Sequence, residues 1–182
     1  MAPSNYLTFI TFVFIHILAI TIPVVANTPT INQPTTIAWH MPRTQPHIAL
    51  TFDDGPDNTI TPQLLDVLAQ KDVSATFFVV GHMVAKYPYI TQRIALEGHD
   101  IANHTWAHYR LDELSQHQIE HQIAATTKLF KYLNIPSTPY MRPPGGRYNN
   151  LVVDASNNQK LMLLMWDVNA ADYKRANGTL PS

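Results

Sequence analysis

The chain has 182 residues, of which 46% are hydrophobic and 14% are charged, and its formal net charge at pH 7 is −1. This length is sufficient for one domain with a substantial buried core. The near-neutral charge, without a run of lysine and arginine, argues against nucleic acid as a partner. The absence of cysteine excludes disulfides and a lipid-modified cysteine anchor.

The N-terminal part of the chain is strongly apolar. No charged side chain occurs before Arg43, and Leu7 to Ala26 is almost wholly apolar and ends in small residues. This pattern predicts a signal peptide over residues 1–26, although an apolar run of about 20 residues also allows an uncleaved anchor that spans a membrane. We therefore expect a bacterial protein that is secreted or held in the cell envelope, with any membrane tether confined to this segment. Residues 27–45, rich in Thr, Pro and Asn, predict a linker before a domain over residues 46–182.

From Pro46 onward, short apolar runs alternate with helical patterns. Strands are expected at 47–52, 74–80, 100–104, 138–144 and 160–168. Helices are expected at 61–71, with Pro62 at the first helical position, at 83–99, ended by Gly98, and at 112–133, with an apolar stripe of Ile119, Ile123, Phe130 and Leu133. This alternation predicts an α/β fold with a parallel sheet or barrel, in which functional groups gather at the carboxyl ends of the strands.

Two adjacent carboxylates, Asp53 and Asp54, follow the first of these strands in the sequence TFDDGP. A cation bound at one carboxylate would offset their repulsion and leave the other free to act as a base toward water. The alternative is an ordinary turn before Gly55-Pro56, which needs only one aspartate.

A histidine pair, His104 and His108, follows the strand at 100–104 in the sequence HTWAH. One helical turn would bring both imidazoles to a common side, and imidazole with carboxylate is a ligand set that zinc accepts. His117 and His121 have the same spacing, but they lie on the helix face opposite the apolar stripe. We therefore expect His117 and His121 to be solvent-exposed side chains without a metal.

A third cluster is the sequence RPPGG. Arg142 stays protonated, so it can hold a carboxylate ionised and oriented. The two prolines stiffen the backbone, and Gly145 and Gly146 allow main-chain N–H groups to approach a ligand closely. The alternative is a rigid loop with a surface arginine.

In order and spacing, TFDDGP, HTWAH and RPPGG resemble the first three signature motifs of the polysaccharide deacetylases, the NodB-like carbohydrate esterases. The resemblance extends from about Ile48 to Tyr173. It implies a distorted (β/α) barrel and a metal-dependent hydrolase that removes N- or O-acetyl groups from polysaccharides. We expect it to act on the N-acetyl groups of GlcNAc-type glycans such as peptidoglycan or chitin oligomers. Zn²⁺ is the preferred metal on ligand type, with Co²⁺ or Mn²⁺ as alternatives.

The resemblance also implies a role for particular residues. The implied catalytic residues are Asp53 as general base, Arg142 as its partner and Asp172 as a supporting carboxylate. The implied metal ligands are Asp54, His104 and His108. The implied oxyanion and substrate contacts are Gly145, Pro144 and Tyr173. Three positions depart from the family pattern, because Asn169 stands in place of Asp, Tyr173 in place of Trp, and Gly145 where many members have an aromatic residue.

The family's fifth motif, Leu-x-His, supplies the general acid, whereas the last histidine here is His121. We therefore expect the barrel to be incomplete at its C-terminal end. The alternative to an active deacetylase is a catalytically impaired remnant that binds a glycan or a metal.

Overall fold

The computed structural model describes residues 37–40, 44 and 46–170. The expected signal peptide and the residues Asp172 and Tyr173 lie outside this range. In the described part of the chain, no helix is long and apolar enough to cross a membrane.

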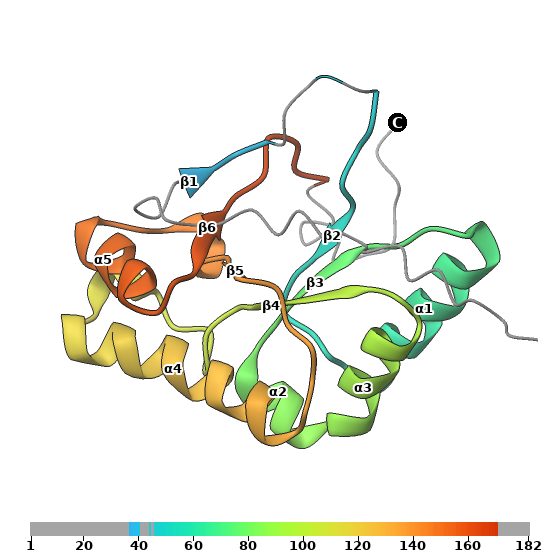
Figure 1. Ribbon diagram of the computed structural model, residues 1–182, viewed down its shortest axis with the longest axis horizontal. Helices are drawn as coiled ribbons and strands as arrows, with labels where there is room; N and C mark the ends of the chain where they lie inside the picture. Colours follow the sequence, from blue (N-terminus) through green and yellow to red (C-terminus); the bar gives the residue numbers. More distant parts are fainter. Residues whose placement is uncertain (1–36, 41–43, 45, 171–182) are drawn as a thin grey trace, which may run out of the picture. The chain divides into compact units, whose positions relative to one another are not determined.

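Six parallel strands form one sheet in the order β1-β6-β5-β4-β3-β2 (Figure 1). The strands are β1 (Ile37–Ala38), β2 (Thr51–Phe52), β3 (Thr76–Val79), β4 (Asp100–Asn103), β5 (Tyr140–Met141) and β6 (Met162–Leu164). The parallel α/β fold predicted from the sequence is confirmed, and each predicted strand contains a shorter observed one. Strand β1 lies within residues 27–45, so part of the expected linker pairs with β6, and the domain boundary at residue 46 stays a prediction.

The sheet is curled into an incomplete barrel. Arg142, directly after β5, donates a hydrogen bond to the Thr51 side chain on β2 at 3.0 Å. In a flat sheet these strands, three positions apart, would be separated by about 14 Å, which an arginine side chain could not bridge. The curl therefore brings the end of β2 across to β5 and β6.

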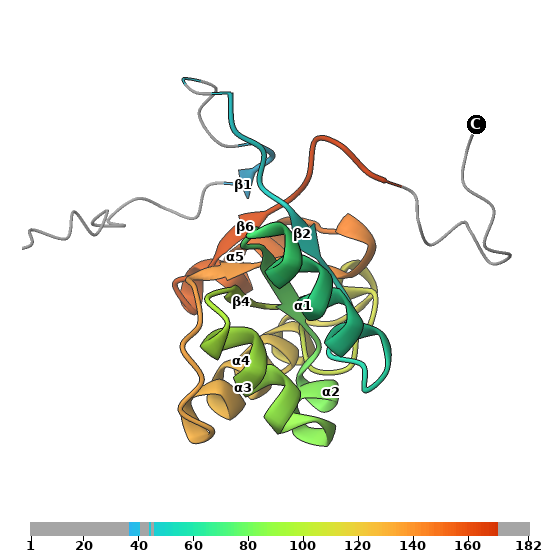
Figure 2. The ribbon, with the colours of Figure 1, turned by 90° about the vertical axis from the view of Figure 1, so that its right-hand side faces the viewer.

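The helical segments are α1 (Ile60–Lys71), α2 (Gly81–Lys86), α3 (Pro88–Leu96), η1 (Leu111–Glu113), α4 (Gln116–Tyr132), η2 (Pro144–Gly146) and α5 (Asn150–Asn158). In both views of the ribbon, α2, α3 and α4 lie on the same side of the sheet (Figure 1, Figure 2). The helices therefore cover one face of the sheet and leave the inner face of the curl to other side chains.

Three helix predictions need correction, and one helix was not predicted. The helix expected over 112–133 is the short η1 followed by α4, which begins at Gln116 after the Ser115 cap. The single helix expected over 83–99 is two helices, because Pro88 begins α3 and disfavours helical geometry at Tyr87 before it. Helix α1 begins at Ile60, ahead of Pro62, because Asp57 Oδ1 accepts the N–H groups of Thr59 and Ile60. Helix α5 was not predicted, and the signal for it was Asn149, whose side chain caps its first turn.

Two hydrophobic clusters pack the helices against the sheet. One joins β3 and β4 to α1 and α3 through residues that include Phe77, Ile101, Leu65 and Ile94. The other joins β5 and β6 to α4 and α5 through residues that include Met141, Leu163, Ile123 and Val152. The predicted apolar stripe is confirmed, since Ile119, Ile123 and Phe130 are buried and Leu133 packs against the cluster that contains Phe130. Side chains alternate along a strand, so Phe78 and Arg142 point to the inner face instead.

Candidate active site

The predicted motifs meet at the carboxyl edge of the sheet. Asp53 and Asp54 follow β2, His104 and His108 follow β4, and Arg142 follows β5. This convergence was predicted, because the carboxyl ends of parallel strands share one edge of the sheet. The structure thus brings together every described residue of the predicted catalytic and metal-binding sets.

Asp54, His104 and His108 form a compact group of three possible metal ligands. Asp54 Oδ1 lies 3.2 Å from His104 Nε2 and 3.0 Å from His108 Nε2. Within residues that the structure describes, this is the one group of at least three His, Asp or Glu side chains close enough to share a metal ion. Zinc bonds of about 2.0–2.2 Å place neighbouring tetrahedral ligand atoms roughly 3.3 Å apart, close to the observed separations.

The hydrogen bonding of His104 orients its Nε2 toward Asp54. Its Nδ1 lies 2.7 Å from the main-chain oxygen of Arg142, and a carbonyl can only accept, so Nδ1 carries the proton. The Nε2 of the neutral ring therefore presents a lone pair to Asp54. Because Asp54 Oδ1 is also an acceptor, a cation between the two atoms, either a proton or a metal ion, would stabilise the group.

The pKa directions follow from this geometry. Hydrogen bonds from His104 and then His108 hold the pKa of Asp54 well below its usual range, against a smaller opposing effect of burial. The hydrogen bond with Asp54 raises the pKa of His108, while burial opposes the shift. In the metal-free protein, both pKa directions favour an ionised Asp54 beside a protonated His108.

The two histidines are brought together by a loop, and the helical turn expected from their spacing is wrong. Thr105 and His108 both have left-handed backbone conformations, with φ values of 68° and 57°. Asn103 Oδ1 accepts the N–H of Thr105, and Thr105 Oγ1 accepts the N–H of His108. Gln122 of α4 accepts a further N–H of this loop at 2.8 Å. Side-chain acceptors therefore set the loop shape, and the ring centroids lie 5.0 Å apart.

Asp53 is held separately by Arg142. The Arg142 guanidinium donates to Asp53 Oδ1 at 2.6 Å and to the main-chain oxygens of Leu164 and Met165, both at 2.9 Å. Arg142 is only 2% exposed, and burial lowers its pKa while Asp53 opposes that shift. The arginine is therefore fixed to the end of β6, and it orients one carboxylate of the pair while the other faces the histidines.

The RPPGG loop forms η2 beside this site. Pro144 is buried, whereas Gly145 is exposed and has a left-handed conformation with φ of 61°. Gly146 is also left-handed, and a β-carbon there would lie 2.6 Å from the Trp166 ring. Glycine at position 146 is thus required by both backbone conformation and space.

Several supporting residues were not identified from the sequence. Thr51 and Trp166 contact the Arg142 guanidinium, and the signal for Trp166 was its position directly after a predicted strand. His117 and His121 are exposed on α4, as expected. Asn169, which stands in place of the family's Asp, is exposed.

The sequence model of the polysaccharide deacetylase family matches residues 40–164, and the chain belongs to this family. A peptidoglycan-N-acetylglucosamine deacetylase of Bacillus cereus is 38% identical over 137 residues, which are 75% of this chain and 50% of that protein. A chitooligosaccharide deacetylase of Sinorhizobium fredii is 36% identical over 132 residues, 71% of this chain and 61% of that protein.

Solved structures agree with this assignment. A peptidoglycan N-acetylglucosamine deacetylase bound to a naphthyl N-hydroxybenzamide is 37% identical, with a TM-score of 0.74 over 77% of this chain and 65% of that chain. The chain therefore spans between half and two thirds of the length of these three relatives.

Proposed function

We propose that this protein is a metal-dependent hydrolase that removes the N-acetyl group from GlcNAc units of an extracytoplasmic glycan. The observation that carries the proposal is that the two adjacent aspartates have different partners. Asp54 Oδ1 meets two imidazole nitrogens at 3.0–3.2 Å, while Asp53 is held 2.6 Å from Arg142. A metal-binding carboxylate beside a positioned, metal-independent carboxylate suits amide hydrolysis by water.

Asp54, His104 and His108 fit a divalent cation of the zinc type. Two imidazoles and one carboxylate leave coordination positions for water and substrate. A bound cation would supply Lewis acidity, polarising the acetyl carbonyl and lowering the pKa of water. Zn²⁺ suits this ligand set best, and Co²⁺ or Mn²⁺ could use the same residues.

The chain's own residues would then perform the proton transfers. Asp53 takes a proton from the attacking water as the water oxygen bonds to the acetyl carbon, and Arg142 keeps the carboxylate aimed at that position. The Gly145 N–H would donate to the developing oxyanion. The C–N bond then breaks as the leaving nitrogen receives a proton, which Asp53 carries. Asp172 and Tyr173 are proposed to support this step and to wall the acetyl pocket, with Pro144 beside it.

Peptidoglycan is the first substrate to test, and chitin oligomers are the second. The support comes from the names of the two relatives, one acting on peptidoglycan and one on chitooligosaccharides. Peptidoglycan lies outside the cytoplasm, which agrees with the signal peptide or anchor proposed for residues 1–26.

The test is acetate release from peptidoglycan and from acetylated chitooligosaccharides by the zinc-loaded chain. Asp53→Asn should lower the rate by about 10²–10⁴-fold, because it removes the general base, while zinc binding is retained. Asp154→Asn, which changes an exposed carboxylate on α5, is the matched control and should leave the rate unchanged.

Acetate release that survives Asp53→Asn would contradict the assigned role of Asp53. Binding of zinc and glycan without acetate release from either substrate would instead favour the remnant that only binds.

A further inference from the structure

The Arg142 guanidinium contacts two aromatic rings in addition to its hydrogen-bond acceptors. Its central carbon lies 3.9 Å from the centroid of the Phe78 ring and 5.4 Å from that of the Trp166 ring. Phe78 is fully buried on β3, whereas Trp166 is partly exposed just beyond β6. Both distances are within the range in which an aromatic face attracts a cation. Trp166 is therefore the solvent-side partner of an otherwise buried cation.

The same tryptophan lies against the glycine loop. A β-carbon built at Gly146 would lie 2.6 Å and 3.3 Å from two atoms of the Trp166 six-membered ring. The ring is thus in close contact with the backbone next to Gly145, the residue proposed to hold the oxyanion. One side chain contacts both the partner of Asp53 and the loop that would stabilise the transition state.

Without the Trp166 ring, hydrogen bonds alone would leave the outer face of the Arg142 guanidinium open to water. Its two main-chain acceptors, the oxygens of Leu164 at the end of β6 and of Met165, belong to the two residues directly before Trp166. A ring over the guanidinium limits its tilt and excludes water that would compete for Asp53. Loss of the ring would therefore allow the Asp53 carboxylate to change its orientation, while the candidate metal ligands would keep theirs.

We propose that Trp166 is a positioning residue that acts through Arg142 to aim Asp53 and that holds the Gly145–Gly146 loop in place. This proposal rests on the proposed function for its catalytic consequence. Its structural consequence, a restrained Arg142 side chain, does not depend on turnover.

The kinetic test compares Trp166→Ala and Trp166→Phe with the unaltered chain. Trp166→Ala should lower kcat for acetate release by about 10–100-fold, by analogy with the loss seen when a residue that orients a metal ligand is removed. KM and the zinc dissociation constant should change less than about threefold, because the ring contacts Arg142 and the glycine loop and not the three candidate metal ligands. Trp166→Phe retains an aromatic face and should recover most of the loss.

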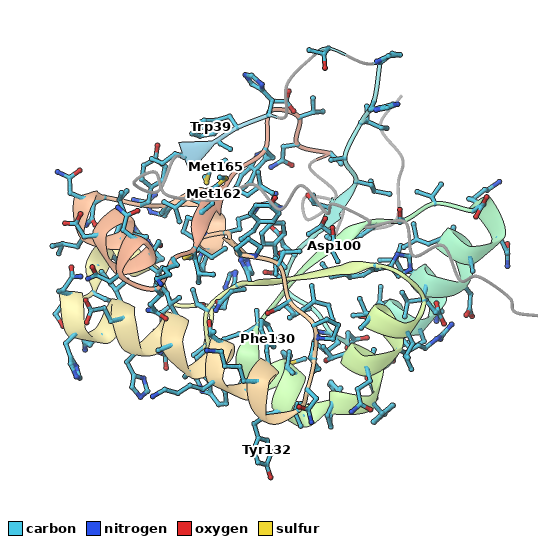
Figure 3. The ribbon with its side chains drawn as sticks, in the orientation of Figure 1. Trp39, Asp100, Phe130, Tyr132, Met162 and Met165 are labelled. Atoms are coloured by element: carbon cyan, nitrogen blue, oxygen red, sulfur yellow. The ribbon has the colours of Figure 1, made fainter. Side chains whose placement is uncertain are left out.

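Tyr132→Ala is the matched control for removing a large aromatic side chain. Tyr132 is 82% exposed and points away from the sheet at the end of α4 (Figure 3). This variant should leave kcat and KM unchanged. In an Arg142→Lys background, Trp166→Ala should add less than about a twofold further loss, because its route of action is already removed.

A second readout keeps the proposal testable if the chain releases no acetate. Arg142 Nε–H, which donates to Leu164 at 2.9 Å, should give a slowly exchanging ¹⁵N resonance, assigned by its disappearance in Arg142→Lys. Trp166→Ala should accelerate its exchange at least about tenfold, and Trp166→Phe should do so much less, while Tyr132→Ala has no effect.

The two failures are distinguishable. Absence of acetate release with the exchange result as expected overturns the proposed function and leaves Trp166 as a restraint on Arg142. Unchanged Nε–H exchange in folded Trp166→Ala and Trp166→Phe overturns the positioning role. The positioning role is also overturned if Trp166→Ala changes only KM or zinc affinity. It is overturned as well if the losses of kcat in Trp166→Ala and Arg142→Lys are independent, so that the double variant shows their product.

Discussion

Removing one histidine of the candidate metal site should abolish stabilisation by zinc, whereas removing a histidine from the equally spaced pair on α4 should not. His104 Nε2 lies 3.2 Å from Asp54 and the side chain is buried, while His117 is exposed on α4. The variants are His104→Ala and His117→Ala. They separate the effect of tertiary placement from the effect of the four-residue spacing.

The magnitude follows from ligand linkage. Free zinc at 100 times its dissociation constant stabilises the folded state by about 2.7 kcal/mol. For a domain of this size, each kcal/mol raises Tm by about 2–4 °C, so zinc should raise Tm by roughly 5–11 °C. His117→Ala should retain this shift, and His104→Ala should lose most of it because two ligands remain from three.

The assay is thermal unfolding of chelator-treated protein, followed by circular dichroism as zinc is titrated. The zinc-induced shift should shrink as the pH falls, because Asp54 raises the pKa of His108 and protons then compete with the metal. Equal zinc shifts in His104→Ala and the unaltered chain would refute the assignment of the metal site. A loss of the shift in His117→Ala would refute the argument from placement.

Two further predictions concern the metal-free protein and the glycine loop. In the presence of chelator, the stability lost in Asp54→Asn should be greatest between pH 3.8 and 6.5, the ordinary pKa values of Asp and His. The lowered pKa of Asp54 stabilises the folded state above the first value, and the raised pKa of His108 stabilises it below the second. A loss of stability that does not vary with pH in urea titrations would contradict this. Gly145→Ala should cost about 1–2 kcal/mol from its left-handed backbone alone, whereas Gly146→Ala should cost a further 1–3 kcal/mol or so from the clash with Trp166. Urea unfolding of both variants measures the difference. Equal losses of stability would show that the Trp166 ring moves aside without a cost in free energy.

The sequence by itself determined the order of the elements and most of the candidate site. Alternating apolar runs and helical stripes are local properties of the chain, so the parallel α/β arrangement followed from them. The residue types of Asp54, His104 and His108 also carried their chemistry, because few side chains can share a divalent cation. His104 and His108 follow a predicted strand, whereas His117 and His121 lie on the outer face of a predicted helix. This difference in position was sufficient to distinguish the candidate metal ligands from the exposed pair.

Tertiary structure decided the features that depend on side chains distant in sequence. The histidines meet through a loop because Asn103 and Gln122 accept its N–H groups, a contact that no helical periodicity encodes. Trp166 became part of the site because β6 pairs with β5, which ends at Arg142, and the curl of the sheet brings Thr51 of β2 to the same arginine. Local propensity cannot report such contacts, since the energy that fixes them comes from packing and hydrogen bonds between elements that the chain brings together only on folding.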